Sequence, residues 1–269
     1  MLTILFLGDI VGEPGRTAVI ARVPEWKQQH GLDFIIVNGE NAASGRGITA
    51  KITIDLLRAG VSVITTGDHI WDQKEIVPFI ATEPRLLRPI NYPNGAPGGG
   101  TIVLETAKGK IGVINVQART FMKPILENPF EALDRAVTEM RKETPVIIVD
   151  AHGETTSEKI AIGRFLDGRV SAVLGTHTHV QTADEQIFAG GTAFICDAGM
   201  CGPNESILGR TIDPIVGRFI SNLPAQMPVA KGEVRLCGVI VQVDESTGRA
   251  VSITRVNEVV AHEPATVTS

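Results

Sequence analysis

Short apolar runs rich in β-branched residues recur along the chain, and they most restrict the fold that it can adopt. Each run is bounded by glycine or polar residues, which is typical of strands that are buried on both faces. The runs are Thr3–Leu7, Phe34–Val37, Val61–Thr65, Ile111–Val116, Val146–Val149 and Val170–Leu174. Helical patterns at Lys51–Ala59, Pro129–Glu143 and Thr156–Leu166 separate several of these runs. This alternation predicts an α/β fold with a largely parallel sheet.

Three local signals refine the predicted helices. Asn128 is the expected N-cap of a helix that begins with Pro129. Thr155 or Thr156, followed by Glu158, predicts a capping box at the start of another helix. Pro24 lies inside the first helical pattern, where we expect it to kink or split the helix.

Other segments predict antiparallel hairpins. Gln186–Cys196 and Gly232–Val259 each contain two strand-like runs around a turn, and Thr101–Val116 has the same form. Two mixed β-sheets flanked by helices accommodate these hairpins better than a pure Rossmann fold does. Because no linker or low-complexity tract divides the chain, we expect residues 1–269 to form a single domain.

Composition excludes several classes of protein. The net charge is −5, and lysine and arginine are scattered singly, so we expect no stable nucleic-acid complex. No apolar run approaches the roughly 18 residues of a membrane span, and the first residues lack the features of a signal peptide. The three cysteines, Cys196, Cys201 and Cys237, have no zinc-type spacing and indicate a reducing cytoplasm. The sequence allows a homo-oligomer.

Polar side chains that can bind metals follow five of the apolar runs. They are Asp9, then Glu40 and Asn41, then Asp68 and His69, then His152, and finally His177 and His179. The carboxyl ends of parallel strands share one edge of a sheet, where ligands bind. A single aspartate after a strand is more often a cap or turn residue. Five such clusters together predict one site.

The residue types in these clusters favour a metal centre. Three of the carboxylates (Asp9, Glu40 and Asp68) and three of the imidazoles (His152, His177 and His179) form a mixed oxygen and nitrogen set that suits Mn, Fe or Zn. Without cations the carboxylates would repel one another. The set exceeds the four ligands of one tetrahedral ion, which favours two ions. His177 and His179 are two residues apart, so on an extended segment both would point to the same side.

The order of these clusters resembles that of the calcineurin-like metallophosphoesterases. The blocks GDIVGEPGR, NGENAASGRGIT, AHGETTSEK, GTHTHVQTAD and DAGMCGP, between Gly8 and Pro203, are similar to the bacterial YmdB-like subgroup. The resemblance implies a four-layer αββα sandwich and a binuclear metal centre. It also implies a phosphodiesterase that hydrolyses small phosphodiesters such as 2′,3′-cyclic nucleotides through attack by a metal-bridging hydroxide.

The same resemblance implies roles for individual residues. One ion would be bound by Asp9, Asn41 and His179, the other by Asp68, His152 and His177, and Glu40 would bridge the two ions. His69 would lie beside the metals without binding them, as the proton donor or as a stabiliser of the transition state. Two positions depart from the wider superfamily: Val11 stands where a histidine ligand is usual, and Asp68 replaces an asparagine.

Two other functions stay open at this point. A metal-dependent amidohydrolase also uses a His-x-His pair, although its barrel of eight βα units would not accommodate the predicted hairpins. A regulatory protein that binds metal and nucleotide with little turnover would need the same residues as the enzyme.

Overall fold

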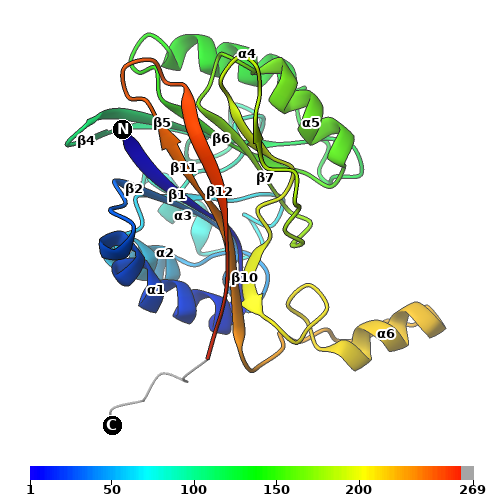
Figure 1. The fold of residues 1–269 in the computed structure, drawn as a ribbon. Helices are drawn as coiled ribbons and strands as arrows, with labels where there is room; N and C mark the ends of the chain where they lie inside the picture. The colour runs from blue at the N-terminus through cyan, green and yellow to red at the C-terminus, as the bar shows by residue number, and fades with distance from the viewer. Residues whose placement is uncertain (262–269) are drawn as a thin grey trace.

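Two six-stranded mixed β-sheets lie face to face in the computed structural model (Figure 1). The first sheet has the order β12-β11-β10-β1-β2-β3. Its strands are β1 (Leu2–Val11), β2 (Phe34–Asn41), β3 (Val63–Thr65), β10 (Met200–Pro203), β11 (Val234–Val243) and β12 (Ala250–Val260). The second sheet has the order β4-β5-β6-β7-β9-β8. Its strands are β4 (Thr101–Thr106), β5 (Gly109–Gln117), β6 (Ile147–His152), β7 (Ala172–Thr176), β8 (Gln186–Ile187) and β9 (Ala193–Ile195).

The structure describes residues 1–261. Residues 262–269, the end of the predicted domain, lie outside this range. That residues 1–269 form one domain stays a prediction.

Alternate side chains of each central strand are buried on opposite faces of its sheet. In β1, Phe6 packs between the two sheets with Ile36 and Ile148, whereas Leu5 and Leu7 face the helices. This alternation follows from the two-residue period of a strand. It explains why the sequence shows continuous apolar runs instead of an alternating pattern.

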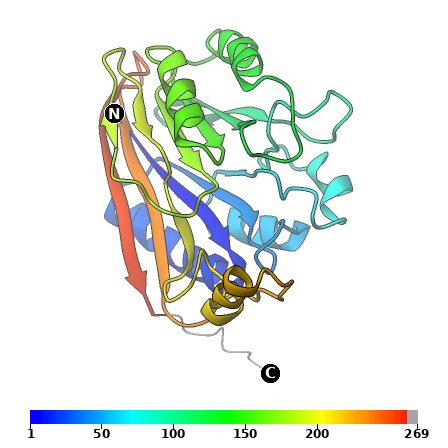
Figure 2. The ribbon, with the colours of Figure 1, turned by 90° about the vertical axis from the view of Figure 1, so that its right-hand side faces the viewer.

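Helices cover the outer faces of both sheets. The helices α1 (Gly12–Gln29), α2 (Ala50–Arg58) and α3 (Ile76–Ile80) contribute to the core of the first sheet. The helices α4 (Pro129–Met140) and α5 (Thr156–Phe165) contribute to the core of the second sheet. The predicted four-layer αββα sandwich is therefore confirmed. One more helix, α6 (Ile212–Ser221), extends away from the sheets at one end of the molecule (Figures 1 and 2).

The predicted hairpins are confirmed as antiparallel pairs, namely β4–β5, β8–β9 and β11–β12. Asn128 caps α4 by accepting a hydrogen bond from the backbone N–H of Phe130. The predicted capping box is wrong, because the side chain of Thr155 makes no capping hydrogen bond. The carboxylate of Glu158 instead accepts from the backbone N–H groups of Arg119 and Thr120.

Of the two effects predicted for Pro24, a split of the first helix is wrong, since α1 continues past it to Gln29. A kink stays a prediction. Within residues 1–261, every helix is too short or too polar to cross a lipid bilayer. All three cysteines are buried and free of disulfides.

Candidate metal centre

The topology brings all five strand-end clusters to one end of the sandwich. In the first sheet, β1, β2 and β3 are parallel neighbours. They place Asp9, Glu40 and Asp68 at the same edge. In the second sheet, β6 and β7 are parallel neighbours that place His152 and His177 opposite those carboxylates.

Four of these side chains form a tight cluster. His152 Nε2 lies 3.2 Å from Glu40 Oε2 and 3.2 Å from Asp68 Oδ1. His177 Nδ1 lies 3.4 Å from the same Asp68 oxygen and 3.1 Å from His152 Nε2. The ligand atoms of all four residues lie within 4.8 Å of one another, an arrangement that could hold a metal ion.

A second group lies on the other side of Glu40. The amide Nδ2 of Asn41 lies 2.9 Å from Glu40 Oε1 and 3.2 Å from His179 Nε2. His179 Nε2 is 3.9 Å from Asp9 Oδ1. Glu40 therefore directs one oxygen toward each group. The structure brings together all seven residues that the sequence analysis selected as metal ligands.

His152, His177 and His179 each have an oxygen acceptor near the outer ring nitrogen. The Thr176 hydroxyl donates to Asp150 Oδ1 at 2.6 Å, so it accepts from Nδ1–H of His152 at 2.9 Å. Glu154 Oε2 lies 3.2 Å from His177 Nε2, and the Leu208 carbonyl lies 3.2 Å from His179 Nδ1. A neutral ring then directs its other nitrogen, with its lone pair, into the cluster. Metal-binding histidines are held in this way.

Two further observations fit a divalent cation at this site. Asp9 Oδ1 is buried and has no hydrogen-bond partner among the described residues, although buried carboxylate oxygens are normally paired. A Cβ at Gly67 would lie 2.1 Å from His152 Nε2 and 2.2 Å from Glu40 Oε2. Only glycine leaves room for both donors at that position.

The carboxylates and imidazoles shift one another's pKa. Burial raises the pKa of Asp9. Burial would also raise the pKa of Glu40 and Asp68, but adjacent histidines, above all His152, outweigh it and hold both below their usual values. Burial opposes a charge on His152, yet the carboxylates, led by Glu40, raise its pKa well above the usual value. The cluster thus attracts positive charge.

The loop that carries His177 and His179 is not extended, so the reason that we gave for their common orientation is wrong. Both residues have positive φ angles, 99° for His177 and 65° for His179. This conformation is strained for residues other than glycine, and such strain is concentrated at functional sites. The strained loop brings both rings into the centre, whereas a regular strand would have continued past the centre.

A buried ion pair holds this loop in place. Asp197 Oδ2 accepts hydrogen bonds from the backbone N–H and the hydroxyl of Thr178, at 3.0 and 2.7 Å. Lys159 Nζ lies 2.9 Å from the same oxygen, and both charged side chains are 1% exposed. Lys159 also donates to the carbonyl of Thr176 at 3.3 Å. The ion pair therefore contacts residues on both sides of His177.

His69 lies beside the cluster. Its Nδ1 is 3.1 Å from Asp72 Oδ2, and its Nε2 is 3.8 Å from Asp68 Oδ2. It lines a cavity of about 990 Å³ together with Glu40, Asn41, His177 and His179. This position suits a group that contacts substrate without binding metal.

Val11, which occupies the position of a histidine in the wider superfamily, is buried. A Cβ at Gly209 would lie 2.5 Å from Val11 Cγ1, so the valine packs closely against the loop that follows β10. Asn41 contacts His179 instead, and it supplies the polar group on that side of the centre.

Sequence reasoning missed the supporting residues Asp150, Glu154, Lys159, Thr176 and Asp197. Asp150 is fully buried, and it accepts from Thr65, Asn38 and Thr176, which belong to both sheets. Burial raises its pKa to about 6. The one signal in the sequence was that several of these residues lie in the blocks that resemble the YmdB-like subgroup.

Comparisons with known proteins agree with this geometry. A model of the YmdB-like protein family matches residues 5–256. Over 255 residues the chain is 48% identical to a 2′,3′-cyclic-nucleotide 2′-phosphodiesterase of Bacillus subtilis, covering 95% of this chain and 96% of that protein. A novel phosphatase from Mycoplasma pneumoniae superposes with a TM-score of 0.90 at 33% identity, covering 98% of this chain and 95% of the other. A hypothetical protein from Thermus thermophilus superposes with a TM-score of 0.89 at 37% identity, covering 97% and 100%. The chain belongs to the YmdB-like family of calcineurin-like metallophosphoesterases.

Proposed function

We propose that this protein is a binuclear-metal phosphodiesterase that opens 2′,3′-cyclic nucleotides. The arrangement of donors on both sides of Glu40 carries the proposal, because it offers two adjacent sets of ligands that share one carboxylate. The relationship to the Bacillus subtilis phosphodiesterase supports the substrate class. The two open sheets exclude the amidohydrolase alternative, which requires a closed barrel.

Each ion would have its own residues. Asp9, Asn41 and His179 would hold one ion, Asp68, His152 and His177 would hold the other, and Glu40 would contact both. Asn41 would use its amide oxygen, because an amide nitrogen is a donor with no free lone pair. The mixed oxygen and nitrogen ligands suit Mn, Fe or Zn. When bound, such ions polarise phosphoryl oxygens and lower the pKa of water.

The chain itself would provide orientation and a proton. His69 lies at the cavity wall, outside both ligand groups, and we assign it the role of general acid for the departing ribose oxygen. Asp72 Oδ2 lies 3.1 Å from Nδ1 of His69, while Nε2 lies on the side of Asp68 and the centre. General acid catalysis of this kind contributes about 10²–10⁴ in rate.

The direct test is hydrolysis of 2′,3′-cyclic AMP and of an aryl phosphodiester by purified protein, with Mn²⁺ and with chelator. We expect turnover that requires metal and that is lost in His177→Ala. The matched control is His30→Ala, because His30 is exposed and lies outside the site. Hydrolysis that persists in His177→Ala would contradict the proposed site. Binding of nucleotide without turnover in the metal-loaded protein would favour the regulatory function.

A further inference from the structure

The cavity at the metal centre extends well beyond the residues that could bind metal. Its outer part is lined by the loop that contains Leu208 and Arg210 and by α6 with Arg218 and Phe219. A volume of about 990 Å³ lies at the upper end of the range for sites that bind drug-sized molecules. There is room for more than the group that reacts.

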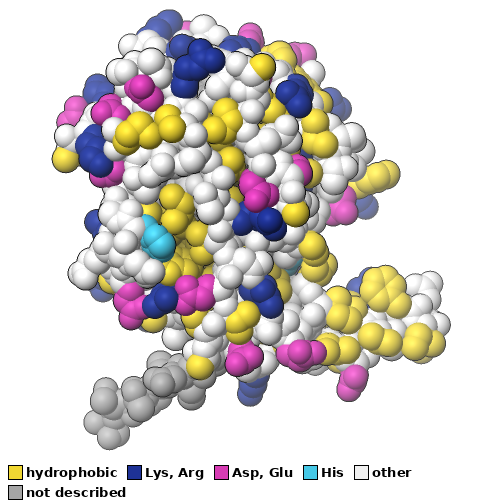
Figure 3. All heavy atoms as spheres, viewed as in Figure 1, with side chains coloured by type: hydrophobic (Ala, Val, Ile, Leu, Met, Phe, Trp, Pro, Cys, Tyr) yellow, Lys and Arg dark blue, Asp and Glu magenta, His cyan; other side chains and the backbone are white. Residues whose placement is uncertain are grey.

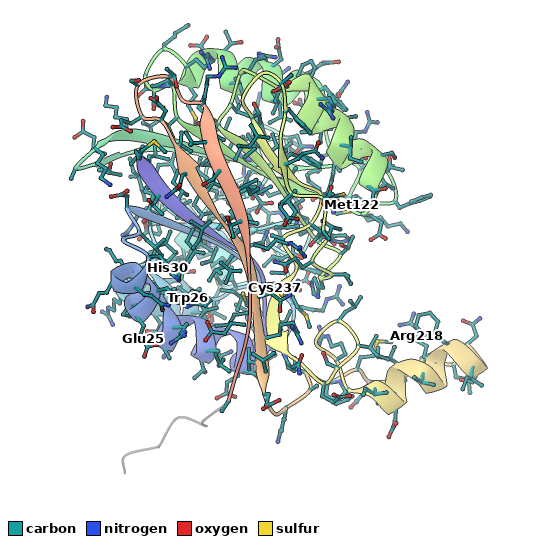
Figure 4. The ribbon with its side chains drawn as sticks, in the orientation of Figure 1. Glu25, Trp26, His30, Met122, Arg218 and Cys237 are labelled. Atoms are coloured by element: carbon teal, nitrogen blue, oxygen red, sulfur yellow. The ribbon has the colours of Figure 1, made fainter. Side chains whose placement is uncertain are left out.

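Three guanidinium groups form a row from the centre toward α6. Arg46 Nη2 lies 3.4 Å from His69 Nδ1. Arg210 donates to the carbonyls of Ser44 and Gly45, which immediately precede Arg46. It also donates to the Met227 carbonyl at 3.0 Å, and Arg218 Nη1 lies 3.8 Å from the Met227 sulfur. Figure 4 shows Arg218 on α6.

The outer part of this row lacks counter-charges. Arg46 pairs with Asp72 at 3.0 Å. Within residues 1–261, neither Arg210 nor Arg218 has a carboxylate within ion-pair distance, and Glu40 is the one acid that lines the cavity. Burial, together with the charge of Arg46, lowers the pKa of Arg210. A row of like charges is costly, and an anion in the cavity would relieve this repulsion.

An exposed aromatic ring stands next to this row. Phe219 is 84% exposed and lines the same cavity. Val216 and Ile220 of α6 are also exposed. Hydrophobic side chains cover much of the visible face of α6 (Figure 3). Proteins that bind single-stranded nucleic acids combine cationic tracks with aromatic rings on which the bases stack.

The chemistry of the proposed substrate shows what could supply the second anion. A 2′,3′-cyclic phosphate requires a 2′-hydroxyl, so its sugar is a ribose. In a free mononucleotide the 5′-oxygen carries no phosphate. At the 3′ end of an RNA strand, that oxygen carries a phosphodiester and then another base.

We propose that the outer cavity binds the penultimate nucleotide of an RNA strand whose 3′ end carries the cyclic phosphate. This inference rests on the proposed function. Arg210 and Arg218 contact the connecting phosphodiester, and Phe219 stacks on the penultimate base. Because the contact covers two nucleotides, it requires no extended basic groove, in keeping with a net charge of −5.

The test compares kcat/KM for 2′,3′-cyclic AMP with that for the dinucleotide ApA ending in a 2′,3′-cyclic phosphate. We expect the wild type to prefer the dinucleotide by about tenfold, since stacking of one base contributes about five- to 150-fold. Arg218→Gln should lower this preference about two- to fivefold, as expected for an exposed ion pair. Phe219→Ala should lower it by at least about fivefold. Arg58→Gln, an exposed position on α2, should leave both rates as in the wild type.

Salt dependence and binding provide independent readouts. The kcat/KM for the dinucleotide should fall more steeply with salt than that for the mononucleotide. In a plot of log kcat/KM against log salt concentration, the two slopes should differ by about 0.7, because the dinucleotide has one additional phosphate. Calorimetry with the unreactive dinucleoside monophosphate ApA should show weaker binding to Arg218→Gln than to the wild type. This binding measurement does not depend on turnover, so it separates failure of the subsite from failure of the proposed function.

Equal kcat/KM values for the two substrates in the wild type would overturn the proposal. So would an Arg218→Gln variant in which both rates fall by the same factor, because the arginine would then contact the reacting phosphate. If Phe219→Ala changes the oligomeric state but leaves the substrate preference intact, α6 is an interface between copies of the chain and the proposal is wrong.

Discussion

Replacement of Lys159 by methionine tests how the histidine loop is held. The change keeps an unbranched side chain of similar length but removes the charge that lies 2.9 Å from Asp197 Oδ2. The carboxylate stays buried and retains its hydrogen bonds from Thr178 and Gly199. Its counter-ion is lost.

The expected destabilisation follows from the burial of the pair. Both side chains are 1% exposed, so solvent cannot screen the remaining charge. Loss of one partner from a buried ion pair costs about 3–5 kcal/mol in free energy of unfolding. At roughly 2–4 °C per kcal/mol, Tm should fall by roughly 6–20 °C. The double variant Lys159→Met/Asp197→Asn removes the unpaired charge, so it should recover part of this loss.

The assay combines thermal unfolding of the metal-free protein with calorimetric titration of Mn²⁺ at a temperature where every variant is folded. Lys159→Met should bind Mn²⁺ at least about tenfold more weakly, as is usual when groups that orient metal ligands are lost. A loss of stability below about 1 kcal/mol would refute the argument from burial. Normal Mn²⁺ affinity in the destabilised protein would refute the positioning role.

Four further predictions concern the centre itself. Gly67→Ala should lose bound metal, because the added Cβ would overlap His152 and Glu40. The control Gly217→Ala should keep its metal, because Gly217 has open space around it. Equal metal content of the two variants by elemental analysis would contradict this prediction. His69→Ala should lower turnover about 10²–10⁴-fold with metal content unchanged, and parallel loss of both would make His69 a ligand. The raised pKa of His152 keeps a proton on this side chain, so Mn²⁺ should displace that proton on binding. Mn²⁺ should therefore bind more weakly as the pH falls. Calorimetric titrations in buffers of different ionisation enthalpy measure the proton release. In the metal-free protein, the same raised pKa should stabilise the fold fully below about pH 6.5, and this contribution should be lost as the pH rises past the folded value.

The predicted strands and the strand ends that carry the candidate ligands were accessible from sequence because they depend on local patterns. Buried runs such as Phe34–Val37 leave few alternatives to a central strand, and the parallel topology then brings Asp9 and Glu40 to one edge of the first sheet. In the same way it brings His152 and His177 to one edge of the second sheet. The supporting contacts were not accessible in this way. Asp150 accepts from residues on both sheets, and Asp197 holds a loop that precedes it by 19 positions. Such bonds depend on how the two sheets pack, which no local pattern encodes.

The loop of His177 shows the same limit. A spacing of two residues predicts a common orientation only in an extended segment, and here the backbone is left-handed at both histidines. The rings converge because Asp197 and Lys159 fix the intervening residue. The two histidines do lie together, as predicted, but the geometric reason for that prediction was incorrect.

The number of metal ions bound per chain tests the central claim most directly. Mn²⁺ titration followed by elemental analysis should give two ions in the wild type and one in His179→Ala, since His179 belongs to only one of the two ligand groups around Glu40. A single ion in the wild type, or an unchanged count in the variant, would contradict a binuclear centre at these strand ends.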